Sequence, residues 1–298
     1  SPSVSRPLSL CLSLTPSVSP SLPSINLSPQ VEPAAAEGRL VSASVDDEYI
    51  INNNIRKDAV LGVCPAQKFQ VSRLLLYLNS ALGPASDVML EPYLLCWEEL
   101  IKFMEALGPL VSFFTGKVQE KITLIRRLVE EEAANFSFLT APDSQVTPNP
   151  QWHAYSSVRS MLVAELQRGV VNFDRRTDSG SRTLLRLHRS LLWLQLLLEK
   201  VVDEGRSYRG RSDGGHSLGA LCAEAYVQAL APHHPWLLQQ AAQLAFKAMP
   251  SRAALLPIVC VHTQEEAEPI ILLIISAIRE VHRRTQRELE QRSMMDLP

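Results

Sequence analysis

The stretch Ser181–Lys200, SRTLLRLHRSLLWLQLLLEK, constrains the fold most strongly, because it combines a large apolar surface with several closely spaced cations. On a helical wheel with about 100° per residue, one arc consists only of leucine and must face a core. The leucines on this arc are Leu184, Leu187, Leu191, Leu194 and Leu198. The pattern therefore predicts a buried helix.

The other side of this predicted helix carries Arg182, Arg186 and Arg189 beside Trp193, with further leucines on both flanks. Removing an unpaired cation from water is costly, so these arginines are expected to contact carboxylates or an anionic ligand. Two interpretations remain open at this point. Arg186 could pair with an acid of a neighbouring helix while the other two lie at the helix rim, or the three could form an anion site.

The composition of the chain excludes several classes of protein. Of its 298 residues, 46% are hydrophobic, which is enough for a sizeable core, and the net charge of −2 provides no general basic field for nucleic acid. The five cysteines are scattered, with no CxxC pair and no zinc-like spacing. They are expected to be reduced thiols of a cytoplasmic protein. No apolar run is long enough to span a membrane.

The order of segments along the chain predicts an all-α domain behind an N-terminal extension. Residues 1–58 comprise a Ser/Pro-rich part, expected to be disordered, and a linker. From Gln67 to Pro298 the hydrophobic period is helical, with no sustained alternation that would indicate a sheet. Besides the central helix, helices are predicted at 69–82, 92–116, 118–135, 155–174, 218–230, 235–249 and 265–292. Ser217 is expected to cap the helix that follows it.

Two apparent catalytic or metal motifs are rejected. The sequence Gly215-His-Ser-Leu-Gly219 matches the G-x-S-x-G elbow of esterases, but that elbow requires a strand leading into the turn, whereas a charged glycine-rich loop precedes it here. The adjacent His233 and His234 point in different directions and have no further ligand at suitable spacing. Neither motif therefore predicts an enzyme or a metal site.

A second group of cations follows the apolar run LGPLVSFF. Lys117 and Lys121 lie one helical turn apart, and Arg126 and Arg127 come later. Glutamates at position 120 and positions 130–132 are close enough in sequence to neutralise them. Taken alone, this group is typical of a solvated helix face.

Several motifs together resemble the glycolipid transfer protein superfamily, and in particular its branch that transfers ceramide-1-phosphate. They are PYLLCWEEL, LGPLVSFFTGKVQEKI, VVNFDRR, SGSRTLLRLHRSLLWLQL, LCAEAYVQALAPHHPWLLQQAAQLAF and the final MMDLP, in family order and with family spacing. The resemblance covers about residues 69–298. It implies a two-layer all-α sandwich that encloses a hydrophobic slot for lipid chains, with a polar headgroup site at its mouth.

The resemblance also implies roles for single residues. Those that would hold the headgroup phosphate are Lys121, Arg182 and Arg186, with Arg176 in support. His234 would donate a hydrogen bond to the ceramide amide carbonyl, and Trp236 resembles the tryptophan used for membrane contact. The slot is expected to be lined by Phe103, Leu107, Phe113, Leu185 and Trp193.

Two positions bear on which headgroup would bind. In sugar-binding members of the family, the position that resembles Arg186 holds a tryptophan that stacks against the sugar. An arginine at this position favours an anionic headgroup instead. Lys117 stands where the family has an aspartate that accepts the ceramide amide N–H, and a lysine has donors only. The sequence therefore predicts an anionic headgroup but departs from the family at the amide contact.

The function expected from this resemblance is transfer of a phosphorylated sphingolipid, ceramide-1-phosphate, between membranes. No bond changes and no cofactor is needed, so the chain is expected not to be an enzyme. It would act as a cytoplasmic monomer that contacts membrane surfaces transiently and binds no nucleic acid. An alternative is a lipid sensor or adaptor that binds the lipid without transferring it.

Overall fold

The computed structural model describes residues 64–65, 67–139, 154–207 and 215–298. The predicted extension 1–58 lies outside these residues. The main helices are α3 (Val71–Ser80), α4 (Leu90–Ala106), α5 (Pro109–Leu139), α6 (Val158–Gln167), α7 (Gly180–Ser207), α8 (Leu218–Ala229), α9 (Trp236–Lys247), α10 (Leu255–Ile258) and α11 (Gln264–Glu290). Within the described ranges there is no β-strand, which confirms the all-α prediction.

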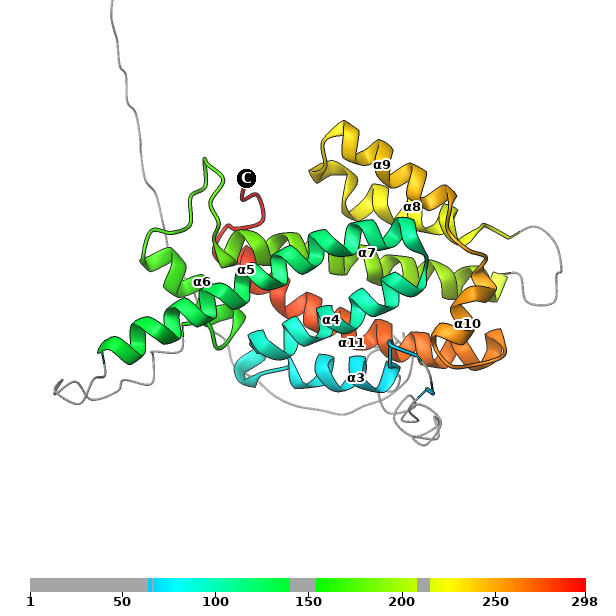
Figure 1. Cartoon of the computed structure of the whole chain (residues 1–298), viewed down its shortest axis with the longest axis horizontal. Coiled ribbons are helices and arrows are strands. Elements are labelled where there is room, and N and C mark those ends of the chain that lie inside the picture. The colour runs from blue at the N-terminus through cyan, green and yellow to red at the C-terminus, as the bar shows by residue number, and fades with distance from the viewer. Residues whose placement is uncertain (1–63, 66, 140–153, 208–214) are drawn as a thin grey trace, which may run out of the picture. The chain divides into compact units, whose positions relative to one another are not determined.

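The helices pack in two layers, as the family resemblance implied. Figure 1 shows α3, α4 and α5 in front, with α7 and α11 behind them. Helix α7 is central, because it packs against α5, α6, α8 and α11. All leucines of its predicted apolar arc are buried, with exposures between 0% and 5%. The chain therefore folds around the helix that the sequence indicated.

Some predicted helix boundaries were wrong for reasons of backbone geometry. The predicted helix 92–116 is interrupted after Ala106, because Gly108 adopts a φ of 122° that other residues avoid. Helix α5 then continues without a break through the predicted gap at Lys117. The predicted helix 155–174 ends at Gln167, two residues before Gly169 with its φ of 67°. The Ser217 cap is confirmed, since its hydroxyl accepts a hydrogen bond from the Ala220 N–H at 3.2 Å.

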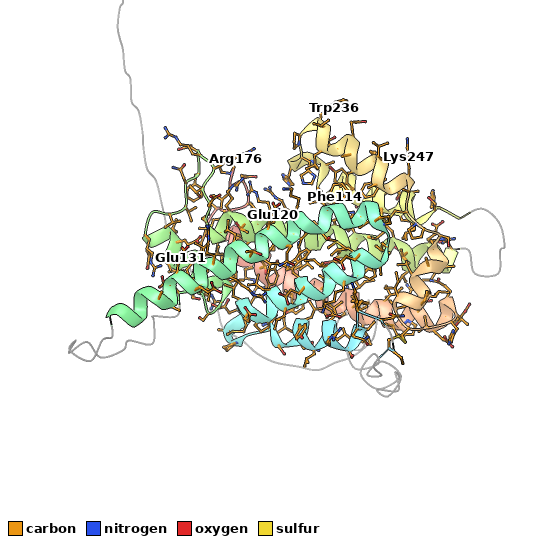
Figure 2. All side chains as sticks on the ribbon, viewed as in Figure 1. Phe114, Glu120, Glu131, Arg176, Trp236 and Lys247 are labelled. Atoms are coloured by element: carbon orange, nitrogen blue, oxygen red, sulfur yellow. A yellow bond between two sulfur atoms is a disulfide. The ribbon has the colours of Figure 1, made fainter. Side chains whose placement is uncertain are left out.

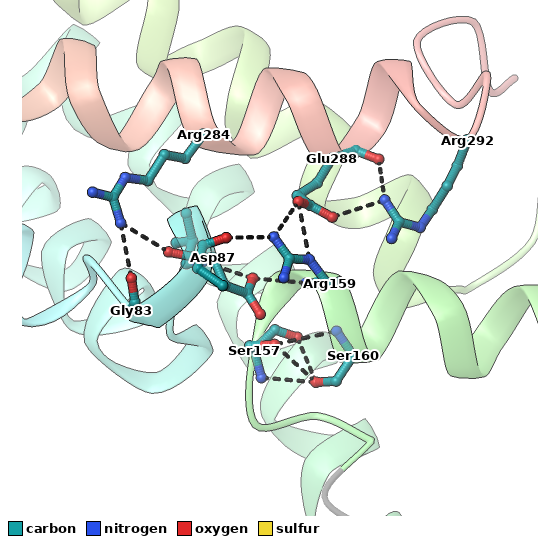
Figure 3. A network of polar contacts seen from close by, with 10 residues as sticks. Gly83, Asp87, Ser157, Arg159, Ser160, Arg284, Glu288 and Arg292 are labelled. Carbon is teal, nitrogen blue, oxygen red and sulfur yellow. Dashed lines mark hydrogen bonds and ion pairs between the residues drawn. The ribbon is translucent and has the colours of Figure 1, made fainter. Parts of the chain in front are cut away.

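A polar network ties α6 to the end of α11 (Figure 3). The Arg159 Nη2 donates to Glu288 Oε1 at 2.8 Å and to the carbonyl of Ala85 at 2.9 Å. The buried Glu288 also accepts a hydrogen bond from Arg292 at 2.8 Å. These contacts fix the C-terminal end of α11, from which the segment 294–298 runs to the arginines of α7.

The expectation of fully reduced cysteines was wrong. Cys64 and Cys260 form a disulfide with a Cα–Cα distance of 6.0 Å, although 196 positions separate them in sequence. The fold brings Cys260, two residues after the end of α10, next to the segment that precedes α3, and the Gln67 side chain also donates to the carbonyl of Pro257 there. Disulfides persist in oxidising compartments, so the cysteines no longer support a cytoplasmic location. In the described part of the chain, no helix is both long and apolar enough to cross a bilayer.

Reduction of this disulfide should destabilise the protein by about 2–5 kcal/mol, because it closes a long loop in the unfolded chain. Thermal unfolding of the full chain with and without reductant measures the effect. The same reductant should leave the Cys64→Ser variant unchanged, since that variant has no bond to lose. Equal melting temperatures of the oxidised and reduced wild type would contradict this prediction.

Two histidines are stacked where α7 meets α11. The rings of His188 and His282 lie 3.9 Å apart between centroids and are nearly parallel, at 15°. Burial, helped by the neighbouring His282, lowers the pKa of His188 to about 3. Burial likewise lowers the pKa of His282 to about 4. Both rings are therefore neutral in the folded protein at pH values where the unfolded chain binds protons.

Stability should therefore fall as the pH is lowered from about 6.5 toward 4, by up to about 1.4 kcal/mol per pH unit for each buried histidine. Urea unfolding at several pH values above 5 measures this slope. A carboxylate such as Glu280, whose pKa Arg283 lowers to about 2, loses its stabilising contribution mainly below pH 5, because the pKa of a free glutamate is about 4.3. In His282→Phe, which keeps a ring against His188, the slope should decrease by about one histidine's contribution. An unchanged slope would refute the account.

Candidate functional site

A cavity of about 270 Å³ lies among α4, α5, α7, α8 and α9. Most of its wall is apolar, from Trp97, Met104, Val111, Phe114, Val118, Trp193, Leu194, Leu230, Leu238, Ala242, Ala245 and Phe246. The polar lining residues are Lys117, Lys121, Arg186, Arg189, Ser190, Tyr226, His233 and His234. Among the described residues that line it there is no Asp or Glu, so the polar lining is cationic or neutral.

The cations at the cavity and beside it come from two helices and a loop, and of those predicted to hold a phosphate, Lys121 and Arg186 line the cavity while Arg182 and Arg176 do not. Helix α7 presents Arg182, Arg186 and Arg189 at spacings of four and three, which places them on one face, and α5 presents Lys121. Figure 2 places Arg176 on the loop that precedes α7. Within the described ranges, no Asp or Glu forms an ion pair with any of these five residues. Of the two interpretations of the arginines, the structure therefore favours an anion site.

The charged forms of several side chains in this cluster are disfavoured, which shows as lowered pKa values. Burial, together with the nearby Arg182 and Arg189, lowers the pKa of Arg186 to about 10. Burial also lowers the pKa of Lys121, with further contributions from Lys117 and Arg186. Burial and the neighbouring Arg176 lower the pKa of Arg182. An anion placed among these side chains would stabilise all of them at once.

The C-terminal segment 294–298 contacts the same arginines through its backbone. Arg182 Nε donates to the main-chain oxygen of Pro298, and Arg189 Nη2 donates to the carbonyl of Met295. Arg186 reaches the carbonyl of Leu297 with both terminal nitrogens, at 3.3 and 3.4 Å. A guanidinium has five N–H donors, so each arginine keeps donors for a ligand. Sequence reasoning missed this contact, because the acceptors are backbone carbonyls.

His234 lies at the cavity beside Tyr226. Its Nδ1 is 2.9 Å from the Tyr226 hydroxyl. Burial, with His233 and Lys121 nearby, lowers the pKa of His234, which favours the neutral ring. When the tyrosine hydroxyl donates to Nδ1, the proton stays on Nε2, which can then donate to a ligand.

The second group of cations divides into two parts. Lys121 faces the cavity and its Nζ donates to the carbonyl of Lys117 at 2.9 Å. Lys117 also lines the cavity, but its side chain is 63% exposed and pairs with Glu120 at 2.8 Å. Arg126 pairs with Glu91 and Glu98, and Arg127 with Glu131. Only the two lysines therefore belong to the site, and the two arginines form the solvated face that the sequence suggested.

Of the residues expected to line the slot, some line the cavity and others lie in the packed core. Trp193 lines the cavity, and its Nε1 donates to the carbonyl of Cys222 at 3.2 Å. Phe103, Leu107 and Leu185 are buried in the core instead, where the Phe103 ring packs 5.4 Å from that of Phe69. The side chain of Phe113 lies outside the described part of the structure. The sequence did not single out wall residues such as Trp97, Tyr226 and Phe246.

Comparison with known proteins identifies the family. The sequence matches the family described as Glycolipid transfer protein (GLTP) over residues 88–261, which is more than half of the chain. This chain belongs to the glycolipid transfer protein family. Human ceramide-1-phosphate transfer protein is 30% identical over 233 residues, covering 77% of this chain and 97% of the relative. The Xenopus laevis protein of the same name is 33% identical over 236 residues, covering 78% of this chain and 98% of the relative.

A solved structure extends the comparison with the glycolipid transfer protein family. The crystal structure of human ceramide-1-phosphate transfer protein in complex with 12:0 ceramide-1-phosphate superposes with a TM-score of 0.62 at 31% identity. The match covers 76% of this chain and 97% of that one. The two-layer fold expected from the family resemblance is therefore confirmed.

Proposed function

We propose that residues 67–298 form a lipid-binding domain that transfers a phosphorylated sphingolipid, ceramide-1-phosphate, between membranes. The observation that carries this proposal is the group of Lys121, Arg186 and Arg189 at the wall of an apolar cavity, none of which forms an ion pair with an Asp or Glu of the described residues. The relatives named ceramide-1-phosphate transfer protein support the same ligand for this chain.

The headgroup phosphate would be held by Lys121, Arg182 and Arg186. Planar guanidinium groups suit phosphate oxygens because they donate two parallel hydrogen bonds, and a charge-assisted hydrogen bond is stronger than a neutral one. Arg176, on the exposed loop before α7, would add long-range attraction. The phosphate would also offset the burial and the repulsion from neighbouring arginines, which together lower the pKa of Arg186.

The lipid chains would occupy the apolar cavity. Burial of a methylene is worth ~0.8 kcal/mol, so a dry slot offsets much of what the chains lose on leaving a bilayer. The wall helices α4, α5, α8 and α9 supply this surface. Capture and release involve no bond cleavage, so we propose a carrier and not an enzyme, and one that needs no cofactor.

Membrane contact would occur at the start of α9. Trp236 and Leu237 are 70% and 73% exposed there, and Figure 2 shows Trp236 projecting from the end of this helix. Exposed aromatic and aliphatic side chains insert readily into the interfacial region of a bilayer. Since α9 also forms part of the cavity wall, the docked protein would hold the cavity next to the membrane.

Transfer of fluorescent ceramide-1-phosphate between vesicles tests the proposal, with a fluorescent monohexosylceramide of the same chain length as the matched control. The full chain should move the phosphate lipid and leave the sugar lipid in the donor vesicles. Equal movement of both lipids would contradict a phosphate-selective site. If the full chain binds the phosphate lipid but moves none, the sensor or adaptor alternative replaces the carrier.

A further inference from the structure

The polar part of the cavity can donate many hydrogen bonds but accept few. Lys117, Lys121, Arg186 and Arg189 only donate. The Ser190 hydroxyl already donates to the carbonyl of Arg186 at 2.9 Å, which leaves only its lone pairs to a ligand. None of the described lining residues is a carboxylate or a side-chain amide. The wall is therefore suited to a ligand that mainly accepts hydrogen bonds.

The excess of donors over acceptors affects how the wall can bind the linkage groups of a lipid, which lie between its phosphate and its chains. A ceramide phosphate presents an amide N–H and a hydroxyl, both of which need acceptors when they are removed from water. A diacylglycerol phosphate presents the same phosphate group but two ester carbonyls, which only accept. A donor-rich wall satisfies the ester linkages at least as well as the amide.

Lys117 is one of the donors on this wall. It lies on α5 one helical turn before Lys121 and lines the same cavity. Its present partner, Glu120, is 64% exposed, and an exposed pair of this kind contributes little to stability. The ammonium group can therefore exchange this partner for a ligand oxygen at little cost.

We infer that the site carries diacylglycerol phosphates as well as the sphingoid phosphate, and that position 117 sets this specificity, because a lysine there offers the amide N–H no acceptor. The inference rests on the proposed function, since it concerns the same cavity and the same phosphate group. Lys117 donates to a linkage carbonyl of either lipid, and the site provides no carboxylate that would favour the amide.

Vesicle transfer of fluorescent phosphatidic acid and fluorescent ceramide-1-phosphate, matched in chain length, tests the inference with the full chain. The wild type should move the two at rates within about threefold of each other, since their phosphate contacts are the same. The Lys117→Asp variant supplies an acceptor for the amide and repels ester carbonyls. It should favour ceramide-1-phosphate by at least about tenfold, which corresponds to one hydrogen bond to a charged group.

Two further variants separate charge from hydrogen bonding. Lys117→Ala removes the cation without adding an acceptor, so both rates should fall while their ratio stays near that of the wild type. Arg127→Asp makes the same kind of charge change on α5 but away from the cavity, and should leave the ratio unchanged. A wild type that moves ceramide-1-phosphate but excludes phosphatidic acid by more than about tenfold would overturn the inference. So would an unchanged ratio in Lys117→Asp, whereas a wild type that moves neither lipid would refute the carrier function itself.

Discussion

Replacement of Arg186 by leucine should reduce transfer of ceramide-1-phosphate by roughly 30- to 150-fold, which corresponds to a loss of about 2–3 kcal/mol in hydrogen bonds to a charged group. Arg186 lines the cavity and lies between Arg182 and Arg189 on the central helix. It is half-buried, so its interaction with a phosphate is less screened by water than that of a surface arginine.

The same substitution should not destabilise the empty protein. Burial and the neighbouring arginines disfavour the charged form of Arg186 and lower its pKa to about 10, so leucine removes an unfavourable charge from the fold. The melting temperature should therefore stay constant or rise while transfer is lost. Arg127→Leu is the matched control on α5, where the side chain is 58% exposed, and it should keep both properties. A variant that transfers normally would contradict the headgroup assignment.

The second large effect is expected at Glu165, which anchors the start of α7. This carboxylate is fully buried and accepts hydrogen bonds from the N–H groups of Gly180 and Ser181 at 2.6 and 2.7 Å. It also accepts from the Ser181 hydroxyl at 2.6 Å and the Tyr155 hydroxyl at 2.9 Å. A negative charge at a helix N-terminus is further stabilised by the helix dipole.

Glu165→Ala should lower stability by about 3–5 kcal/mol, because it leaves several buried donors without an acceptor. In a domain of this size the melting temperature should fall by roughly 10 °C. Tyr155→Phe is the graded control, since it removes only one of these hydrogen bonds and should cost about 1 kcal/mol. Thermal unfolding of both variants measures the difference. Equal stability of the two would show that Glu165 does not hold the helix.

Much of the fold followed from local pattern. The leucine arc of α7 is visible because helical periodicity repeats side chains on one face, and all of it is buried. The break at Gly108 was missed although the pair Gly108-Pro109 is a turn signal, because the apolar pattern continues across it. The bond between Cys64 and Cys260 was missed because pairing across 196 positions depends on tertiary structure.

The site was predictable only where side chains carry the chemistry. Three arginines within an apolar surround left an ion pair and an anion site as alternatives, and in the described ranges none of the three forms an ion pair with an Asp or Glu. The slot was less predictable, because apolar periodicity identifies buried positions without telling a packed core from a cavity wall. Phe103 and Leu185 therefore turned out to be core residues, while Trp193 lines the cavity.

A crystal structure of the full chain bound to ceramide-1-phosphate would test the central claim most directly. The account predicts phosphate oxygens within hydrogen-bond distance of Lys121, Arg182 and Arg186, with lipid chain atoms against Trp97 and Phe246 in the cavity. A phosphate bound elsewhere, with these cations still in contact only with protein carbonyls, would contradict it.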